Sequence, residues 1–400
     1  MRFILHSSHG GFGPWDWATA RERGIGGSET SHIEIARRLA RRGHEVISYA
    51  PVPLDSVRFR LGFAVDDAGV VWKHHEGADF TLPGTWLVYR APTVIDRFPE
   101  ASRVNQRIYL ICQDVWYHDL TRENGSKFDA VVALCFEHAK YLYERYGLDN
   151  IGISSNGICT DELLRLPNER RHVNRLIWAS SPDRGLLTLL RIFRRVRERV
   201  PTAELHVFYG FDNIDKAIAD WQKAHPTAPG AAHPWARAKA EILREADQPG
   251  VVWRGRVGQR ELWSEFLRAS FWVYPTDFTE TSCIASMEAM ALGCIPITRP
   301  YWPLAENVQH GVLIDGDPVG DALVRARYVK AIVELMGDPV MREQCRADMM
   351  PWAQEYFNWE VVVDQVEEWA AEAAQYTDEV MPGIDPLCVT SPVLQEALAT

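Results

Sequence analysis

Short apolar runs alternate with amphipathic segments along the first part of the 400-residue chain. The runs are typical of buried parallel strands, and the segments between them carry apolar residues at helical spacing. Strands are predicted at Arg2–Leu5, Val46–Ala50, Thr85–Tyr89, Arg107–Cys112, Ala130–Ala133 and Ile151–Ser154. Helices are predicted from Ser28, as N-cap, to Gly43 and over Glu137–Tyr146. This alternation indicates an α/β domain with a mostly parallel sheet.

A second series of the same kind follows the polar segment Arg165–Asn174, which we interpret as an interdomain linker. Its predicted strands are Arg175–Ala179, Glu204–Tyr209, Gly250–Arg254, Phe271–Tyr274, Cys294–Ile297 and Gly311–Ile314. Its predicted helices are Leu186–Arg199, a helical insertion over Ala217–Ala246 broken at His225–Pro234, Arg260–Ala269, Ile284–Leu292, Arg325–Leu335 and Val340–Tyr356. We therefore predict α/β domains over residues 1–168 and 169–356, a helix over about 357–375 and an irregular tail over 376–400.

Composition narrows the class of protein. The net charge of −11 argues against polyanion binding as the main task, and 46% hydrophobic residues fit a folded globular chain. Seven scattered cysteines without a Cys-x-x-Cys pair indicate reduced thiols. The first residues hold too short an apolar run for a signal peptide, and no run reaches the roughly 20 residues of a spanning helix. We expect a soluble, cytoplasmic protein.

The stretch Phe271–Ile297 carries the main candidate chemistry. It predicts strand, loop, helix and strand, with Glu280 in the loop and Glu288 inside the helix. Thr281 or Ser282 is expected to cap this helix. A helix N-terminus suits a diphosphate, and carboxylates on either side suit the hydroxyl groups of a sugar and a ribose. On spacing alone, an acidic loop followed by an ordinary surface glutamate explains the pattern equally well.

The same stretch resembles the signature of retaining GT-B glycosyltransferases, which use nucleotide-sugar donors. Glu280 is followed after seven residues by Glu288-Ala-Met-Ala, then Gly293 and Pro296. The resemblance implies that Glu280 lies by the donor sugar and Glu288 holds the ribose. Where the family has glycines, this chain has Thr281, Ser282 and Cys283, which stay candidates for donor contacts through backbone N–H groups. The implied fold is GT-B, with two Rossmann-like domains facing a central cleft.

Gly26 and Gly27 precede the first long helix. They resemble the family's Gly-Gly pair, which approaches the donor diphosphate. A helix cap with a flexible lead-in is the other interpretation of the same residues. A dinucleotide-binding fingerprint is excluded because Glu29 occupies its third glycine position.

Polar residues follow three predicted strands of the first domain, where ligands of parallel sheets bind. Gln113 stands where the family places a histidine by the donor sugar, and His118 comes five residues later and is a candidate for that role. A loop histidine with only a structural role is the alternative for His118. Asn156, in a Ser-Asn-Gly turn, is a further candidate for donor binding.

Arg184 is the strongest basic candidate. It stands in a turn between a strand and a helix, where a guanidinium can bridge a diphosphate through two hydrogen bonds. The family has a second basic residue five positions earlier, but this chain has Ala179 there. Arg254 or Arg256 is expected to supply the missing charge, although a surface role explains either arginine equally well.

No metal site or cofactor is predicted. Asp315-Gly316-Asp317 has the spacing of a cation site, but it is also a turn sequence, and we favour the turn. The resemblance implies transfer of a sugar from a nucleoside diphosphate to an acceptor hydroxyl, with retention at the anomeric carbon. A nucleotide-sugar epimerase and a non-catalytic nucleotide-sugar-binding protein are the alternatives.

The acceptor is left open. A glycan, a lipid-linked sugar, a protein or a modified nucleic acid would each enter through the variable loops of the first domain. The arginines at 37, 38, 41 and 42 could contact an anionic membrane, although solvation of an exposed helix face is the simpler interpretation.

Overall fold

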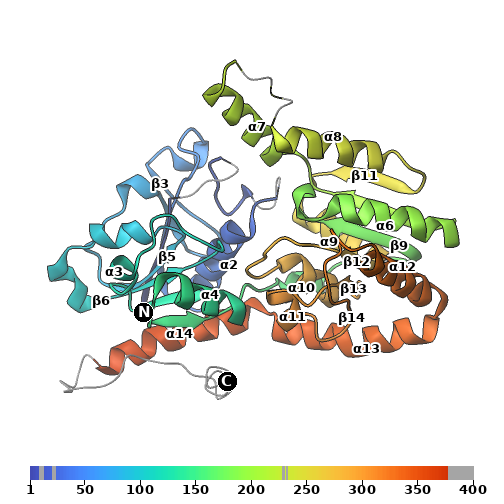
Figure 1. Ribbon diagram of the computed structural model, residues 1–400. Helices are drawn as coiled ribbons and strands as arrows, with labels where there is room; N and C mark the ends of the chain where they lie inside the picture. Colours follow the sequence, from blue (N-terminus) through green and yellow to red (C-terminus); the bar gives the residue numbers. More distant parts are fainter. Residues whose placement is uncertain (9–12, 20–23, 228–229, 231–232, 377–400) are drawn as a thin grey trace. The chain divides into compact units, whose positions relative to one another are not determined.

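The computed structural model describes residues 1–8, 13–19, 24–227, 230 and 233–376 (Figure 1). Two compact units divide these residues. Unit 1 comprises residues 1–157 except Gly24, together with 359–376, and unit 2 comprises residues 158–358 together with Gly24. The chain thus passes between the units at Gly157–Ile158, ahead of the polar segment that the sequence suggested as a linker. Among the described residues, no helix is both long and apolar enough to cross a bilayer.

Unit 1 is built on an eight-stranded sheet with the order β3-β4-β2-β1-β5-β6-β7-β8. The strands are β1 (Arg2–Ser7), β2 (Glu45–Ala50), β3 (Phe63–Val65), β4 (Val71–His74), β5 (Gly84–Tyr89), β6 (Gln106–Ile111), β7 (Ala130–Ala133) and β8 (Ile151–Ile153). All neighbours pair in parallel except β3, which runs antiparallel to β4 at the edge. Neither β3 nor β4 was predicted, because both strands are short and neither has the continuous apolar run of a buried strand.

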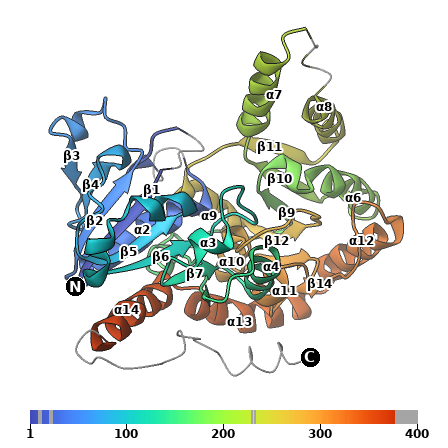
Figure 2. The same ribbon diagram turned by 60° about the vertical axis from the view of Figure 1, so that its left-hand side comes forward.

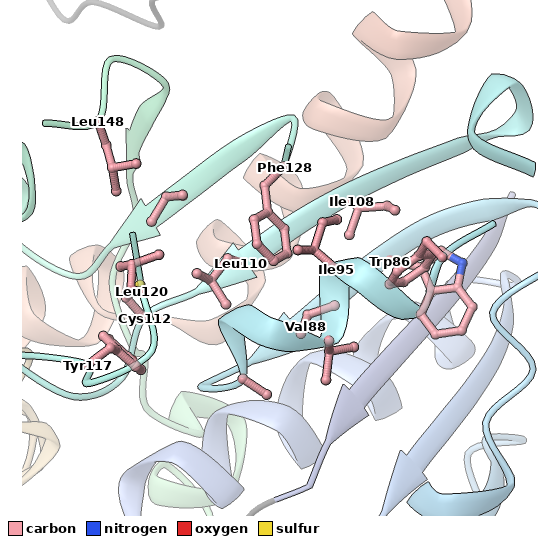
Figure 3. Packing of buried hydrophobic residues seen from close by; sticks show 14 of the residues in the cluster. Trp86, Val88, Ile95, Ile108, Leu110, Cys112, Tyr117, Leu120, Phe128 and Leu148 are labelled. Carbon is pink, nitrogen blue, oxygen red and sulfur yellow. The ribbon is translucent and has the colours of Figure 1, made fainter. Parts of the chain in front are cut away.

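The helices of unit 1 are α2 (Gly27–Arg41), α3 (Arg122–Gly125), α4 (Phe136–Tyr146) and α14 (Trp359–Tyr376). Short 3-10 turns occupy Val57–Phe59, His75–Gly77, Pro92–Arg97 and Glu100–Asn105. Figure 3 shows part of the core, in which Trp86 and Val88 of β5 lie beside their register partners Ile108 and Leu110 of β6. These side chains are fully buried, so apolar burial on this face of the sheet is a main source of the unit's stability.

The arginines of α2 make ion pairs within unit 1. Arg37 bonds Asp66, and Arg42 bonds three carboxylates of α14, namely Glu360, Asp364 and Glu367. Arg37 and Arg38 are also buried, at 3% exposure each. The presence of Arg37, Arg38 and Arg42 on α2 is explained by these ion pairs, which join the helix to its neighbours. Solvation or membrane contact is not needed to explain them.

Unit 2 contains a wholly parallel six-stranded sheet with the order β11-β10-β9-β12-β13-β14. Its strands are β9 (His172–Ala179), β10 (Glu204–Phe208), β11 (Val251–Gly255), β12 (Ala269–Tyr274), β13 (Ile295–Thr298) and β14 (Val312–Leu313). Its helices are α5 (Thr160–Leu163), α6 (Leu186–Arg199), α7 (Asp212–Ala224), α8 (Pro234–Ala246), α9 (Gln259–Arg268), α10 (Ile284–Ala291), α11 (Pro303–Asn307), α12 (Ala322–Gly337) and α13 (Pro339–Tyr356), with a 3-10 turn at Pro182–Arg184.

The predicted helical insertion is the pair α7 and α8, which stand together beyond the edge strand β11 (Figures 1 and 2). Two predicted helix caps are wrong. Helix α2 begins after Gly26 rather than Ser28, and α10 begins after Cys283 rather than Thr281 or Ser282. Neither observed N-cap residue accepts a side-chain hydrogen bond, so local backbone geometry outweighs the preference for a hydroxyl cap.

Candidate functional site

Two loops meet at the carboxyl ends of the central strands of unit 2. The loop after β9 contains Arg184, and the loop after β12 contains Glu280. Gly185 has a φ of +113°, and a Cβ added to it would lie 2.6 Å from the carbonyl oxygen of Pro275. Only glycine permits this close approach without strain, so Gly185 brings the two loops into contact.

Arg184 and Glu280 form an ion pair at this edge. Nη1 of Arg184 donates to both carboxylate oxygens of Glu280, at 2.9 and 3.0 Å. The hydroxyl of Tyr274, the last residue of β12, donates to Oε1 of the same carboxylate at 2.5 Å. Burial, then the charge of Glu280, raises the pKa of Tyr274 well above its usual value, so this phenol stays protonated as a donor. Glu280 is only 7% exposed and is therefore held in one orientation.

The other edge of the Arg184 guanidinium is unused. Its Nε is buried and has no hydrogen-bond partner, and among the described residues Nη2 donates to no acceptor. The ring of Phe278 covers the guanidinium, whose carbon lies 4.3 Å from the ring centroid. Burial alone would lower the pKa of Arg184, but the Glu280 charge raises it, so the group stays cationic. Nη2 is not among the buried atoms that lack a partner, so it is the donor that an anionic ligand can reach.

The start of α10 has an uncommon backbone. Cys283, its N-cap residue, has a φ of +57°, a left-handed conformation that favours glycine. Its carbonyl accepts the hydroxyl of Ser286 at 2.7 Å, and the carbonyl of the preceding Ser282 accepts the amide of Asn307 at 2.6 Å. Thr281, Ser282 and Cys283 thus lie between Glu280 and α10, where their N–H groups were predicted to contact a donor.

Glu288 lies in the second turn of α10 and is 5% exposed. Its Oε1 accepts Nε2 of Gln259 at 2.5 Å and the indole Nε1 of Trp263 at 2.7 Å, both from α9. Burial raises the pKa of Glu288 to about 7, although both hydrogen bonds act to lower it. This carboxyl is buried and held by α9, so the interpretation as an ordinary surface glutamate is wrong.

Arg256 follows β11, the edge strand of the sheet. Its guanidinium lies 4.5 Å from the ring centroid of Tyr209, a cation–π contact. Tyr209 is the first residue after β10, the neighbouring strand, and has a φ of +92°. Non-glycine residues with positive φ thus follow β10 at Tyr209 and precede α10 at Cys283, both on the edge of the sheet that carries Arg184.

In unit 1, Gln113 and Asn156 form a reciprocal pair of amides. Nε2 of Gln113 donates to Oδ1 of Asn156 at 3.1 Å, and Nδ2 of Asn156 donates to Oε1 of Gln113 at 3.2 Å. His118 instead lies on the exposed part of the same loop, edge-on against the ring of Trp116 at 4.3 Å. The structure therefore brings together two of the three polar candidates of unit 1.

Gly26 is the N-cap residue of α2 and Gly27 its first residue, and the first turn of that helix also holds the buried carboxyl of Glu29. Burial raises the pKa of Glu29, and Oε1 lies 3.8 Å from Nη1 of Arg90. Arg90, which follows β5 with a φ of +61°, also makes a two-point ion pair with Asp114, at 2.6 and 3.0 Å. From the sequence, only the backbone of Gly26 and Gly27 was expected to approach a ligand at this helix start. The structure adds charged side chains near it.

Sequence reasoning missed Tyr274, Gln259 and Trp263. The sequence indicated only that Tyr274 belongs to an apolar strand. It is the last residue of β12, so its hydroxyl group lies at the carboxyl end of the strand, where it reaches Glu280. Gln259 directly precedes the predicted helix Arg260–Ala269 and is the first residue of the observed α9, where its spacing of four from Trp263 places both on one face. Neither the strand-end position nor the helical spacing predicts which carboxylate these side chains contact.

No group of three or more His, Cys, Asp or Glu side chains that could hold a metal ion occurs within the described ranges. Asp317 accepts the backbone N–H groups of Val319 at 2.8 Å and Gly320 at 3.0 Å. These bonds close a turn, which is the interpretation favoured for residues 315–317.

Comparisons with known proteins give matches only among solved structures. No protein-family model and no curated protein matches the chain. A sucrose-phosphate synthase from Thermosynechococcus elongatus aligns with a TM-score of 0.68 at 15% identity, over 94% of this chain and 99% of that chain. A glycosyltransferase from Rickettsia africae ESF-5 aligns with a TM-score of 0.63 at 12% identity, over 94% and 98%. HepE from Anabaena, in complex with UDP and glucose, aligns with a TM-score of 0.62 at 13% identity, over 93% and 100%.

Sequence identities this low carry information on the fold alone. The alignments extend over nearly the full length of both chains in all three cases, and each unit of this chain contains a mostly parallel sheet. The chain therefore has the GT-B fold, the two-domain α/β architecture of these glycosyltransferase structures.

Proposed function

We propose that this protein is a glycosyltransferase that moves a sugar from a nucleoside diphosphate to an acceptor hydroxyl, with retention at the anomeric carbon. The observation that carries the proposal is the Arg184–Glu280 pair. One guanidinium nitrogen bonds the carboxylate, while Nη2 has no partner among the described residues and offers its two N–H groups to a phosphate. An anion site directly beside an oriented carboxylate matches the diphosphate and the hydroxylated ring of a nucleotide-sugar.

The proposed roles follow from the contacts. Arg184 binds the diphosphate, and Glu280 accepts hydrogen bonds from hydroxyls of the transferred sugar. The buried carboxyl of Glu288 binds the ribose, and Arg256, at the end of β11, contacts the nucleotide near its base. Backbone N–H groups of Thr281, Ser282 and Cys283 add donors between the two carboxylates. In unit 1, Gly26 and Gly27 and the Gln113–Asn156 pair are proposed donor contacts, and His118 stays a candidate catalytic residue.

Catalysis in this proposal is mainly electrostatic. As the bond between the anomeric carbon and the phosphate oxygen breaks, negative charge grows on the departing diphosphate, and Arg184 and backbone N–H groups meet it without reorganisation. The acceptor hydroxyl attacks the face of the sugar that the diphosphate leaves, and its proton passes to the departing diphosphate oxygen, so the anomeric configuration is retained. No protein nucleophile is required, and retention is supported by the resemblance of Glu280–Pro296 to retaining enzymes.

The proposal also covers cofactors, acceptors and location. We propose that no metal ion is needed, so activity should survive EDTA. A glycan or lipid-linked sugar is the acceptor class we would test first, followed by protein and nucleic acid. The six cysteines of the described part are free thiols, which supports a reducing, cytoplasmic location.

A donor panel tests the function. Purified protein is incubated with UDP-, GDP-, ADP- and TDP-sugars and a cell extract as acceptor source, and products are followed by mass spectrometry. The UDP-sugars come first because HepE was solved with UDP and glucose. A sugar-sized mass increase on an acceptor supports transfer, and NMR of the product's anomeric proton gives retention or inversion. Conversion of the donor without acceptor would indicate an epimerase, and tight binding without turnover a sensor.

A further inference from the structure

Helix α9 presents two hydrogen-bond donors to one atom of Glu288. Gln259 and Trp263 lie one helical turn apart, and both donate to Oε1, at 2.5 and 2.7 Å. Among the described residues, Oε2 of Glu288 accepts no hydrogen bond. The carboxyl therefore has one oxygen with two donors and one oxygen without any.

This uneven distribution leaves one carboxyl oxygen without a partner in the protein. Oε2 is not among the buried side-chain atoms that lack a hydrogen-bond partner, so solvent, or a ligand in its place, can reach it. Placing both donors on Oε1 fixes the rotation of the carboxyl group and directs Oε2 in one direction.

We propose that Trp263 and Gln259 are positioning residues that hold Glu288 so that Oε2 receives the ribose hydroxyls of the donor nucleotide. The inference rests on the proposed function for the assignment of Glu288 to the ribose, and adds the two residues that set its geometry. Trp263 is buried, at 5% exposure, on the face of α9 that contacts Glu288. Gln259 lies nearer the surface and contributes the second bond.

A role in positioning predicts a change in selectivity, whereas a role in folding predicts only a loss of stability. If Glu288 is free to rotate, the protein loses its preference for a nucleotide with ribose hydroxyls over one without them. The contacts to the diphosphate are unchanged by this rotation. The ratio of the two dissociation constants is therefore the diagnostic quantity, and a purely structural substitution would leave it unchanged.

The experiment is isothermal titration with UDP and with 2′,3′-dideoxy-UDP, and with GDP and its dideoxy form as a second pair. We expect the wild type to prefer the ribonucleotide by roughly tenfold or more, as for loss of hydrogen bonds to a charged group. Trp263→Phe keeps an aromatic ring but removes the N–H donor, and Gln259→Met keeps the chain length but removes the amide. Trp235→Phe, at a 38% exposed site on α8, is the matched control.

The expected result is that Trp263→Phe lowers the preference to within about threefold and Gln259→Met lowers it partly, while Trp235→Phe leaves it unchanged. Thermal unfolding of each variant shows whether it is folded, and Gln259→Met decides the outcome if Trp263→Phe is not. A wild-type preference that both variants retain would overturn the inference. A wild type that binds none of these nucleotides would instead overturn the proposed function.

Discussion

Nη1 of Arg184 donates to both oxygens of the Glu280 carboxylate, while the Nε of the same guanidinium is buried without a partner. The two residues are 96 positions apart in the chain and are brought together by the close approach at Gly185. A ligand that binds Nη2 of Arg184 would share one guanidinium group with Glu280. Substitutions of the two residues should therefore have different effects on a bound diphosphate.

Replacing Arg184 tests the anion site. Arg184→Gln removes two charged hydrogen bonds to a phosphate, and the affinity for UDP should fall by about 10- to 150-fold, or roughly 1.5–3 kcal/mol. The matched control is Arg191→Gln, on the exposed face of α6, where the guanidinium pairs with Glu241. Isothermal titration measures both variants. Equal affinity in the Arg184 variant and the wild type would remove this residue from the site.

The hydroxyl of Tyr274 should matter for turnover more than for nucleotide binding. Tyr274→Phe removes the donor to Oε1 of Glu280, and the sugar-binding carboxylate loses part of its orientation. We expect kcat to fall by about tenfold while the affinity for bare UDP is unchanged. The control is Tyr328→Phe, because the Tyr328 hydroxyl is buried without a hydrogen-bond partner. A loss of UDP affinity in the Tyr274 variant would contradict this separation.

The raised pKa of Glu288 predicts a pH dependence of stability. The unfolded carboxyl has a pKa of 4.5, and the folded value is about 7, so the folded protein binds more protons between these values. Its contribution to the free energy of unfolding must therefore fall as the pH rises through this window. Between pH 5 and pH 8 the loss is about 2–3 kcal/mol.

Glu288→Gln should remove this part of the pH dependence. Chemical denaturation of the wild type and the variant at both pH values gives the comparison. The stability of the variant relative to the wild type should increase toward pH 8. A difference that stays constant, or that changes with the opposite sign, would show that the Glu288 carboxyl is ionised throughout in the folded protein.

Arg42 should hold α14 against α2. It contacts Glu360, Asp364 and Glu367, and its removal leaves three neighbouring carboxylates without their shared counter-charge. These carboxylates are partly exposed, so Arg42→Ala should cost only ~1 kcal/mol, and less at high salt. Arg41→Ala is the control, because Arg41 is exposed on the same helix. Hydrogen exchange of the α14 amides should accelerate in the Arg42 variant alone.

Much of the strand order along the chain was predictable because buried parallel strands are apolar runs bounded by turn residues. The predicted strand Ala130–Ala133 agrees with β7, and the predicted break in the insertion separates α7 from α8. The caps at α2 and α10 were wrong because a hydroxyl cap contributes only about 1 kcal/mol. At α10 this preference is overridden by the left-handed backbone of Cys283, which depends on the surrounding loop.

The sequence predicted which residues belong to the candidate site better than it predicted the contacts that those residues make. Arg184, Glu280 and Glu288 stand at positions that strand ends and the family resemblance indicate. Their hydrogen-bond partners could not be predicted. Tyr274 and Trp263 have largely apolar side chains that indicate core positions, and only the hydroxyl and the indole N–H make the contacts. Which carboxylate they bond depends on tertiary packing between elements that are adjacent in space.

The most direct test of a nucleotide-sugar site in unit 2 is a titration of UDP into Glu280→Gln and Glu288→Gln, alongside steady-state rates with the donor sugar. At pH 8, above the raised pKa of Glu288, Glu288→Gln should weaken UDP binding by about 10- to 150-fold through the ribose. Glu280→Gln should leave UDP affinity unchanged or slightly improved, because Nη1 of Arg184 is released, and should lower turnover. Equal losses of UDP affinity in both variants, or no effect from either, would contradict the assignment of the two carboxylates.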